Sequence, residues 1–246
     1  MASRTHAGAA PREPLSTERV LQAALALADA GGIEALTMRR LGQQLGVEAM
    51  SLYKHVANKD AILDGIVELA VGEIALPAPG EDWKAAMRRR GISAHEVLLR
   101  HPWACSLLMS RTNIGPAMLR YVDSTLGSLR GAGFSIELAD YAWNAMDSHI
   151  YGFTLQELNF PIEPQQFAEA ARTYLPLLPP GRYPHLTEMA VHVMEGSYDG
   201  VPDFTFGLDL ILDGLERILM ERLILRTATR HARHTAGGAP PSPSAR

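Results

Sequence analysis

One short stretch constrains this chain more than any other. It runs from Thr37 to Val56 and reads T-M-R-R-L-G-Q-Q-L-G-V-E-A-M-S-L-Y-K-H-V. Thr37 suits a helix N-cap, because its hydroxyl can accept a hydrogen bond from a backbone N–H of the first turn. Gly46 stands where a left-handed residue ends a helix, which predicts a first helix over about 37–45. The residues after Gly46 predict a second helix of barely two turns.

This pair of helices has the pattern of a helix-turn-helix. The apolar positions that can hold the two helices together are Leu41, Leu45, Val47, Leu52 and Val56. The polar and basic side chains that can point outward are Arg39, Arg40, Ser51, Tyr53, Lys54 and His55. A short, basic second helix fits the major groove of B-DNA. The stretch therefore predicts double-stranded DNA as a partner.

The flanking sequence predicts one further helix on each side. Ser16 is the candidate N-cap of a helix that ends at Gly31 and Gly32, and Asn58 is the candidate N-cap of a helix from Lys59 to about Ile74. The run L-P-A-P-G at 76–80 then breaks the helical pattern. We therefore expect a DNA-binding domain over 15–75.

The rest of the chain predicts helices and no strand. The expected helices are 83–100, 102–109, 116–131, 136–158, 164–175, 185–195 and 204–229. The expected fold is all-α: an N-terminal three-helix DNA-binding domain with a helix-turn-helix, followed by a larger helical ligand-binding and dimerisation domain over 82–226. We expect a disordered tail over 230–246 and a disordered arm over 1–14. Arg4 and Arg12 leave open that this arm follows the DNA minor groove.

The charge of the chain is unevenly distributed. Its net charge of −4 is unusual for a DNA-binding protein, but residues 1–60 hold seven Lys/Arg and six Asp/Glu, whereas residues 61–225 hold twelve and twenty-one. A local patch rather than the net charge sets the affinity for phosphates. The one cysteine, Cys105, excludes an internal disulfide and is expected to be a small buried hydrophobe. No signal peptide or membrane-spanning run is evident, so we expect a cytoplasmic protein without a membrane partner.

Two parts of the sequence resemble a known family. The run G-I-E-A-L-T-M-R-R-L-G-Q-Q-L-G-V-E-A-M-S-L-Y-K-H-V-A-N-K-D-A-I-L-D resembles the TetR family of transcriptional repressors. G-F-S at 133–135 and F-x-F-G-L-x-L-I-x-x-G-L-E at 204–216 resemble the regulatory domain of its tetracycline repressor subgroup. The resemblance covers roughly 15–225. It implies a homodimer whose interface is a four-helix bundle, built here from the helices at 135–158 and 204–226.

The resemblance also implies a set of DNA contacts. Arg39 matches an arginine that reads guanine, and Tyr53, His55 and Lys59 match residues that bind phosphates. Ala49 stands where the subgroup has a base-reading glutamine, so a different operator is expected. The full expected set is Thr37, Arg39, Arg40, Ala49, Met50, Ser51, Tyr53, Lys54, His55 and Lys59. For each of these positions the alternative is a solvated helix surface.

The effector of this chain is expected to differ from tetracycline with magnesium. The positions that hold that drug in the subgroup align near Ile74 and at Arg90, Ala94, Leu108 and Arg111, and none of the residues is kept. The candidate ligand-pocket residues are Trp103, Met109, Met118, Trp143, Asp147 and His149. The alternative is that these residues form plain core or a dimer seam, and that His149 is a hydrogen-bonded interior histidine.

The sequence thus predicts a homodimeric repressor that binds a palindromic operator and is released by a small molecule of unknown identity. An activator or a ligand-independent repressor remains open. The alternative from another class is a helical ligand-binding or enzymatic protein with a vestigial DNA-binding head. No Ser-His-Asp order, P-loop or Gly-rich fingerprint supports an enzyme. We expect no cofactor and no metal site, because His231 and His234 lack further ligands.

Overall fold

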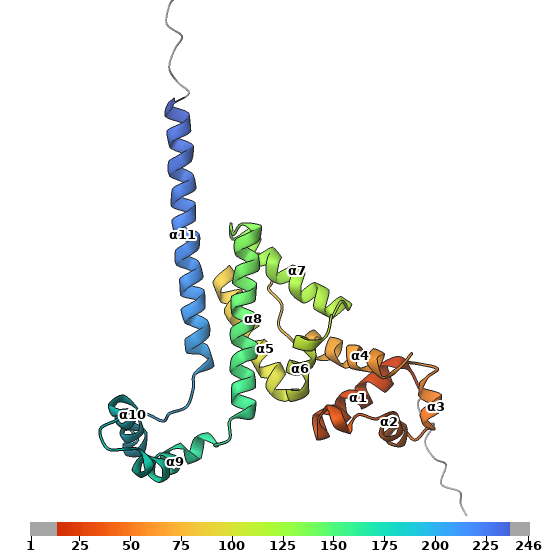
Figure 1. Cartoon of the computed structure of the whole chain (residues 1–246). Helices are drawn as coiled ribbons and strands as arrows, with labels where there is room; N and C mark the ends of the chain where they lie inside the picture. Colours follow the sequence, from red (N-terminus) through yellow and green to blue (C-terminus); the bar gives the residue numbers. More distant parts are fainter. Residues whose placement is uncertain (1–13, 237–246) are drawn as a thin grey trace, which may run out of the picture. The chain divides into compact units, whose positions relative to one another are not determined.

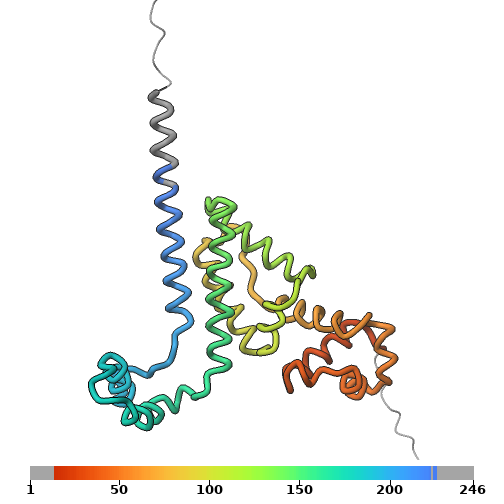
Figure 2. Tube along the Cα trace, in the orientation of Figure 1, coloured from red at the N-terminus to blue at the C-terminus, as the bar shows by residue number. Residues whose placement is uncertain are grey.

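The described part of the chain is built from α-helices. The structure, a computed structural model, describes residues 14–236, and within that range it contains no strand. The predicted all-helical fold is confirmed (Figures 1 and 2). The helices are α1 (Thr17–Gly31), α2 (Met38–Leu45), α3 (Ala49–Leu52), α4 (Lys59–Gly72), α5 (Trp83–Arg100), α6 (Pro102–Ser110), α7 (Pro116–Gly131), α8 (Ile136–Asn159), α9 (Phe167–Tyr174), α10 (Pro184–Glu195) and α11 (Phe204–Ala236), with short 3₁₀ turns η1 (Ile33–Ala35), η2 (Pro164–Gln166) and η3 (Leu175–Leu177).

Close contacts divide the chain into two compact units. Among the described residues, the first unit contains residues 14–74 together with Glu96–Val122. The second unit contains Ala75–His95 and residues 123–236. The domain limits of 15–75 and 82–226 expected from the sequence stay a prediction. No helix of residues 14–236 combines the length and the apolar character that crossing a membrane requires.

The inward faces of α1, α2, α3 and α4 form a hydrophobic core in the first unit. Its fully buried side chains include Val20, Ala24, Leu41, Leu52, Ile62 and Ile66. The predicted N-caps are confirmed, because the side chains of Ser16, Thr37 and Asn58 each accept a hydrogen bond from a first-turn N–H. Each cap satisfies one backbone donor that has no partner inside the helix.

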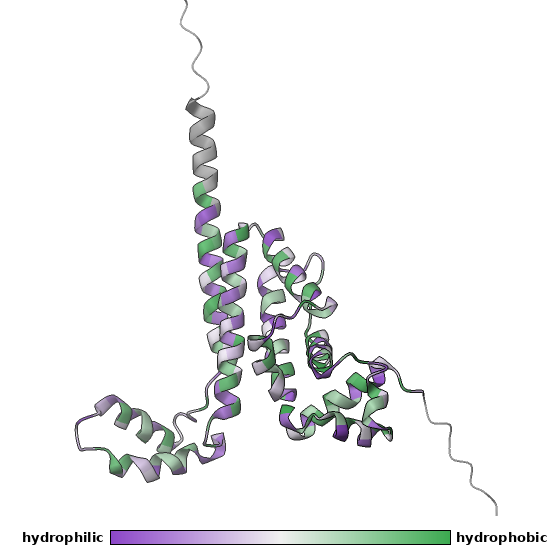
Figure 3. Ribbon diagram, turned by 45° about the vertical axis from the view of Figure 1, so that its right-hand side comes forward, coloured by the Kyte–Doolittle hydropathy of each residue, from purple (hydrophilic) through white to green (hydrophobic). Residues whose placement is uncertain are grey.

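In the second unit, α8 packs against α11, with hydrophobic residues along both helices (Figure 3). Ser135 caps α8 as predicted. The buried contacts of the pair include Ala139, Met146, Ile150, Leu208 and Leu212. The adjoining α9 and α10 pack against each other.

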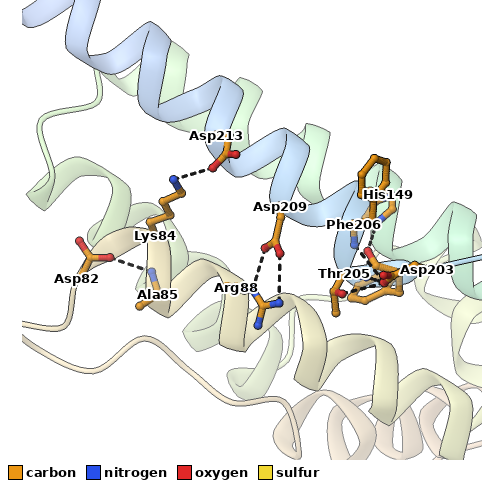
Figure 4. A network of polar contacts seen from close by, with 11 residues as sticks. Asp82, Lys84, Ala85, Arg88, His149, Asp203, Thr205, Phe206, Asp209 and Asp213 are labelled. Carbon is orange, nitrogen blue, oxygen red and sulfur yellow. Dashed lines mark hydrogen bonds and ion pairs between the residues drawn. The ribbon is translucent and has the colours of Figure 1, made fainter.

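A ladder of ion pairs connects the first turns of α5 to α11 (Figure 4). The Nζ of Lys84 lies 2.7 Å from Oδ1 of Asp213 and 2.6 Å from Oε2 of Glu216, and the Nε of Arg88 lies 2.7 Å from Oδ1 of Asp209. The hydrogen bonds to Asp213 and then Glu216 raise the pKa of Lys84 to about 12. The side chains of these groups are 30–61% exposed, so the ladder fixes the register of the two helices more than it adds stability.

The last helix is longer than the sequence predicted. It ends at Ala236, beyond the expected end near Thr229 and inside the segment expected to be a disordered tail. The remainder of that tail, 237–246, and the arm over 1–13 with Arg4 and Arg12 lie outside the described residues.

Two glycines determine how α2 meets α3. Gly46 adopts φ 69° and ψ 34°, the left-handed conformation predicted for it, which L-residues with a side chain rarely adopt. Gly42 lies at the crossing itself, where an added Cβ would be 2.8 Å from the carbonyl oxygen of Val47 and 3.2 Å from the backbone nitrogen of Ala49. The absence of a side chain at Gly42 therefore lets the backbones of α2 and α3 come this close.

We expect Gly42→Ala to lower the free energy of unfolding by about 1–3 kcal/mol, because the added methyl overpacks a contact between two backbones. Urea denaturation followed by circular dichroism measures this change. The matched control is Gly127→Ala in α7, where nothing lies within 4 Å of the added Cβ. The control should keep wild-type stability or gain up to about 1 kcal/mol. Equal stability of the two variants would contradict the close-approach argument.

Candidate nucleic-acid interface

The turn between α2 and α3 holds the second helix in a fixed direction. The backbone N–H of Gly46 donates to the carbonyl of Gln43, and that of Val47 donates to the carbonyl of Gly42 at 2.9 Å. These bonds satisfy the last carbonyls of α2 in the manner of a left-handed C-cap. The side chain of Leu52 is fully buried and holds α3 against the rest of the first unit.

The reading segment, the helical stretch from Ala49 to Val56, continues past the end of α3. Leu52 is the last residue of α3, which is shorter than predicted, but the N–H groups of Lys54, His55 and Val56 still donate to carbonyls three or four residues earlier. The carbonyl of His55 also accepts a hydrogen bond from the hydroxyl of Thr17 at 2.9 Å. Helical turns therefore continue to Val56, and α1 fixes their far end.

The outward surface of this segment carries most of the side chains that the sequence assigned to DNA contact. Met50 and Tyr53 are 75% and 45% exposed. The cationic residues Arg39, Arg40, Lys54 and Lys59 are exposed as well. Half-buried positions are Ala49, Ser51 and His55. Thr37 is exposed, and its hydroxyl accepts the N–H of Arg40 as a helix cap.

The local charge of this surface is positive although the whole chain is acidic. Between residues 35 and 59 the only acid is Glu48, beside the four cations Arg39, Arg40, Lys54 and Lys59. Among the ion pairs of the described residues, none involves these four cations. Their charges are therefore available to a polyanion.

Polar contacts hold α4 along its whole length within the first unit. Arg111 donates to Asp60 at 3.1 Å and to Asp64 at 2.9 Å. The carboxylate of Glu68 accepts the N–H groups of Ala117 and Met118, the first turn of α7, at 2.6 and 3.1 Å. The carboxylate thus caps α7 from a different helix.

The C-terminal end of α4 joins a second polar cluster. His101 is buried, with Nδ1 2.7 Å from Asp29 and Nε2 3.2 Å from Glu73. Arg100 also donates to Glu73. Burial by itself raises the pKa of Glu73, but the hydrogen bonds from Arg100 and His101 together outweigh it, and the pKa lies below its ordinary value. Glu73 is therefore a stable anion that holds α4 to α5 and α6.

The candidate ligand residues fall into separate environments. In the first unit, the Nε1–H of Trp103 donates to Asp29 at 2.7 Å, while Met109 is 62% exposed and Met118 is half-buried. No local sequence pattern predicts the Trp103–Asp29 pair, because the two residues are far apart along the chain. The role of these residues as a ligand pocket stays a prediction.

In the second unit, the structure brings Trp143 and Asp147 together. The carboxylate of Asp147 accepts from the Nε1–H of Trp143 at 2.7 Å and from the fully buried guanidinium of Arg90. His149 has its Nε2 2.9 Å from the carbonyl oxygen of Phe204, and its ring stacks on that phenyl ring. Figure 4 shows His149 beside the start of α11. His149 is half-buried and hydrogen-bonded, and both readings of it, as a ligand contact and as an interior histidine, stay predictions.

A surface hollow of about 590 Å³ lies between the segment 77–83 and the α7 residues Ser124, Gly127, Ser128 and Gly131, a region the sequence indicated only as a linker. Cys105 is buried as predicted, and burial raises the pKa of its thiol to about 11, so the reactive thiolate is scarce. No group of three His, Cys, Asp or Glu suited to a metal occurs among residues 14–222.

The geometry defines a class: a helical protein with a helix-turn-helix head and an exposed cationic reading surface. Comparisons make the class more specific. Residues 20–66 match the family model for bacterial regulatory proteins of the tetR family, and residues 76–219 match the tetracyclin repressor-like C-terminal domain. The chain belongs to the TetR family of transcriptional regulators, in the subgroup with that C-terminal domain.

Individual relatives span most of the chain. The HTH-type transcriptional repressor DrrR1 of Streptomyces coeruleorubidus is 30% identical over 223 residues, covering 86% of this chain and 81% of DrrR1. The class D tetracycline repressor of Escherichia coli is 34% identical over 205 residues, covering 82% and 89%. The structure of apo ActR from Streptomyces coelicolor has a TM-score of 0.71 at 29% identity, covering 85% and 99%. DrrR1 is named as a transcriptional repressor, and the Escherichia coli protein is named as a tetracycline repressor.

We expect Glu68→Ala to lower the free energy of unfolding by about 1 kcal/mol, the usual cost of losing a helix cap, because two N–H groups of α7 lose their acceptor. Chemical denaturation measures the difference. Glu96→Ala removes an exposed glutamate from α5 and serves as the matched control, with stability close to wild type. If Glu68→Ala were as stable as Glu96→Ala, the capping contact would contribute nothing measurable to the free energy of unfolding.

Proposed function

We propose that the protein is a homodimeric repressor that binds a palindromic operator and leaves it when a small molecule binds. The observation that carries the proposal is the exposed, cationic surface of α2, α3 and the start of α4, held rigidly by the Gly42 crossing and the caps. Relatives support the repressor role, since DrrR1 is named a transcriptional repressor. ActR has been solved in complex with actinorhodin, which supports release by an effector.

In this proposal the side chains have different roles on DNA. Arg39 makes a bidentate contact to guanine, worth about 1–3 kcal/mol of discrimination. Tyr53, His55 and Lys59 bind phosphates and so fix the register of α3 in the groove. Arg40 and Lys54 add positive charge, which speeds encounter and strengthens binding at low salt. A DNA-binding regulator acts where the chromosome is, so the proposal includes a cytoplasmic location.

The dimer of this proposal forms through α8 and α11. The side of α11 opposite its buried residues carries Phe206, Leu210 and Ile224, which are 57–68% exposed. On α8, Tyr141 is 65% exposed. Apolar side chains on the outer side of a packed helix pair are typical of a surface that a second copy covers.

The effector of this proposal is an organic molecule other than tetracycline with magnesium. Arg90 and Arg111 stand at two of the positions that hold the drug in the subgroup, and both form ion pairs here. Candidate contacts are Trp103, Met109, Met118, Trp143, Asp147 and His149. Arg111, Glu68 and Glu73 make the polar contacts that hold α4 in place. A ligand that favours a different set of these contacts therefore changes how α4 supports the helix-turn-helix.

We expect binding to promoter DNA flanking the gene to weaken steeply with salt, and Lys59→Gln to reduce the slope of log affinity against log salt by about 0.9 for each lost phosphate contact. A dimer loses two such contacts, one from each protomer. Fluorescence anisotropy over a salt series measures the slopes. Arg182→Gln removes an exposed cation of the second unit, outside the proposed DNA-binding surface, and should leave the slope unchanged.

Salt-insensitive binding, or no binding, would contradict the proposal. Either result would favour the alternative of a helical ligand-binding or enzymatic protein whose head has lost its DNA function. If Arg182→Gln reduced the slope of log affinity against log salt more than Lys59→Gln does, the DNA surface would lie elsewhere on the protein.

We expect Leu210→Glu to dissociate the dimer, because it places a charge in the centre of the apolar surface of α11 and burying that charge is costly. Sedimentation velocity measures the mass in solution. Leu177→Glu changes a leucine of η3 that is 73% exposed and should leave the dimer intact. A wild-type protein that is monomeric at micromolar concentration would refute the dimer.

A further inference from the structure

Met50 is an exposed methionine on the outward face of α3. It is 75% exposed, although the neighbouring Leu52 is fully buried. Residues three and four positions apart share one face of a helix, so Met50 lies beside Tyr53 and Lys54. An unbranched thioether is flexible and makes only apolar or very weak polar contacts. A strongly exposed apolar tip therefore lies among the polar groups of the reading surface.

The neighbouring position has the same chemical character. Ala49, the first residue of α3, is half-buried and offers only a methyl group. Neither Ala49 nor Met50 carries a side-chain group able to form a strong hydrogen bond with a base edge. Most features of the major groove are hydrogen-bond donors and acceptors, and the apolar one is the C5-methyl group of thymine.

We propose that Met50, with Ala49 beside it, selects thymine in each half-site of the operator by apolar contact with the C5-methyl group. This inference rests on the proposed function, since it specifies what the reading helix recognises. Arg39 contacts a different base in that proposal, so the two side chains make separate contributions to specificity. The partner is double-stranded DNA with thymine at the base pairs that α3 faces.

The test removes the methyl group and keeps the base pair. After footprinting has located the operator, each thymine is replaced in turn by deoxyuridine, which lacks only the C5-methyl group. We expect the wild-type protein to lose about fourfold in affinity for each contacted methyl, the equivalent of one buried CH₂ group. The loss should occur at one or two thymines of each half-site and at the symmetric positions of the other half.

A double-mutant cycle assigns the methyl contact to Met50. Met50→Ala should bind the thymine and deoxyuridine operators almost equally, whereas Met50→Leu, which keeps an apolar tip, should still prefer thymine. Met189→Ala, an exposed methionine of α10, is the matched control and should behave as wild type. Thermal melting of each variant confirms that the head is folded.

The outcomes separate this inference from the proposed function. If wild type binds its operator but no deoxyuridine substitution weakens binding, the methyl readout is refuted and the repressor proposal stands. If Met50→Ala keeps the full thymine preference, another residue reads the methyl and the assignment to Met50 is refuted. If wild type binds no promoter DNA, the proposed function itself fails.

Discussion

The structure of the head depends on the close approach of two backbones at Gly42. That residue leaves room for the carbonyl of Val47, and Gly46 turns the chain in a conformation that suits glycine. The buried Leu52 then fixes the rotation of a reading segment whose regular helix is only four residues long. Such a short helix has little stability of its own, because most helical stability in proteins comes from tertiary packing. The direction of α3 is therefore imposed by α2 and by the hydrogen bond from Thr17 to His55.

The same short segment explains how an acidic protein can be a DNA-binding regulator. Its four cations lie beside one acid, and they are free of ion pairs among the described residues. Elsewhere many cations are paired, as Lys84, Arg88 and Arg111 are. Pairing neutralises their fields, so the long-range attraction for DNA comes from the head. Net charge alone would have pointed away from this function.

Much of the fold could be predicted because its signals are local. The N-caps Ser16, Thr37, Asn58 and Ser135 and the left-handed Gly46 act within one helical turn, and the sequence alone reveals them. The polar contacts around α4 could not be predicted. Glu68 and Ala117, like His101 and Asp29, are separated by dozens of residues, and no local pattern pairs them.

The remaining differences have similar physical reasons. The end of α11 was misjudged because its polar and basic sequence after Leu225 has no apolar periodicity, although alanine and arginine favour helices. The expected DNA contacts rest on the match of residues 37–59 to a family pattern, and they stay a prediction. The candidate ligand residues had no comparable pattern, and the structure assigns Trp103 and Trp143 to separate carboxylates.

The central claim is that α3 and its flanking cations meet the DNA. Hydroxyl-radical footprinting of the promoter region, with wild type and Tyr53→Ala compared at equal concentration, tests it most directly. The account predicts an inverted repeat protected on one face of the duplex, with half-sites about one helical turn apart or slightly more, and protection lost in the variant. Protection without twofold symmetry, or equal protection by Tyr53→Ala, would contradict it.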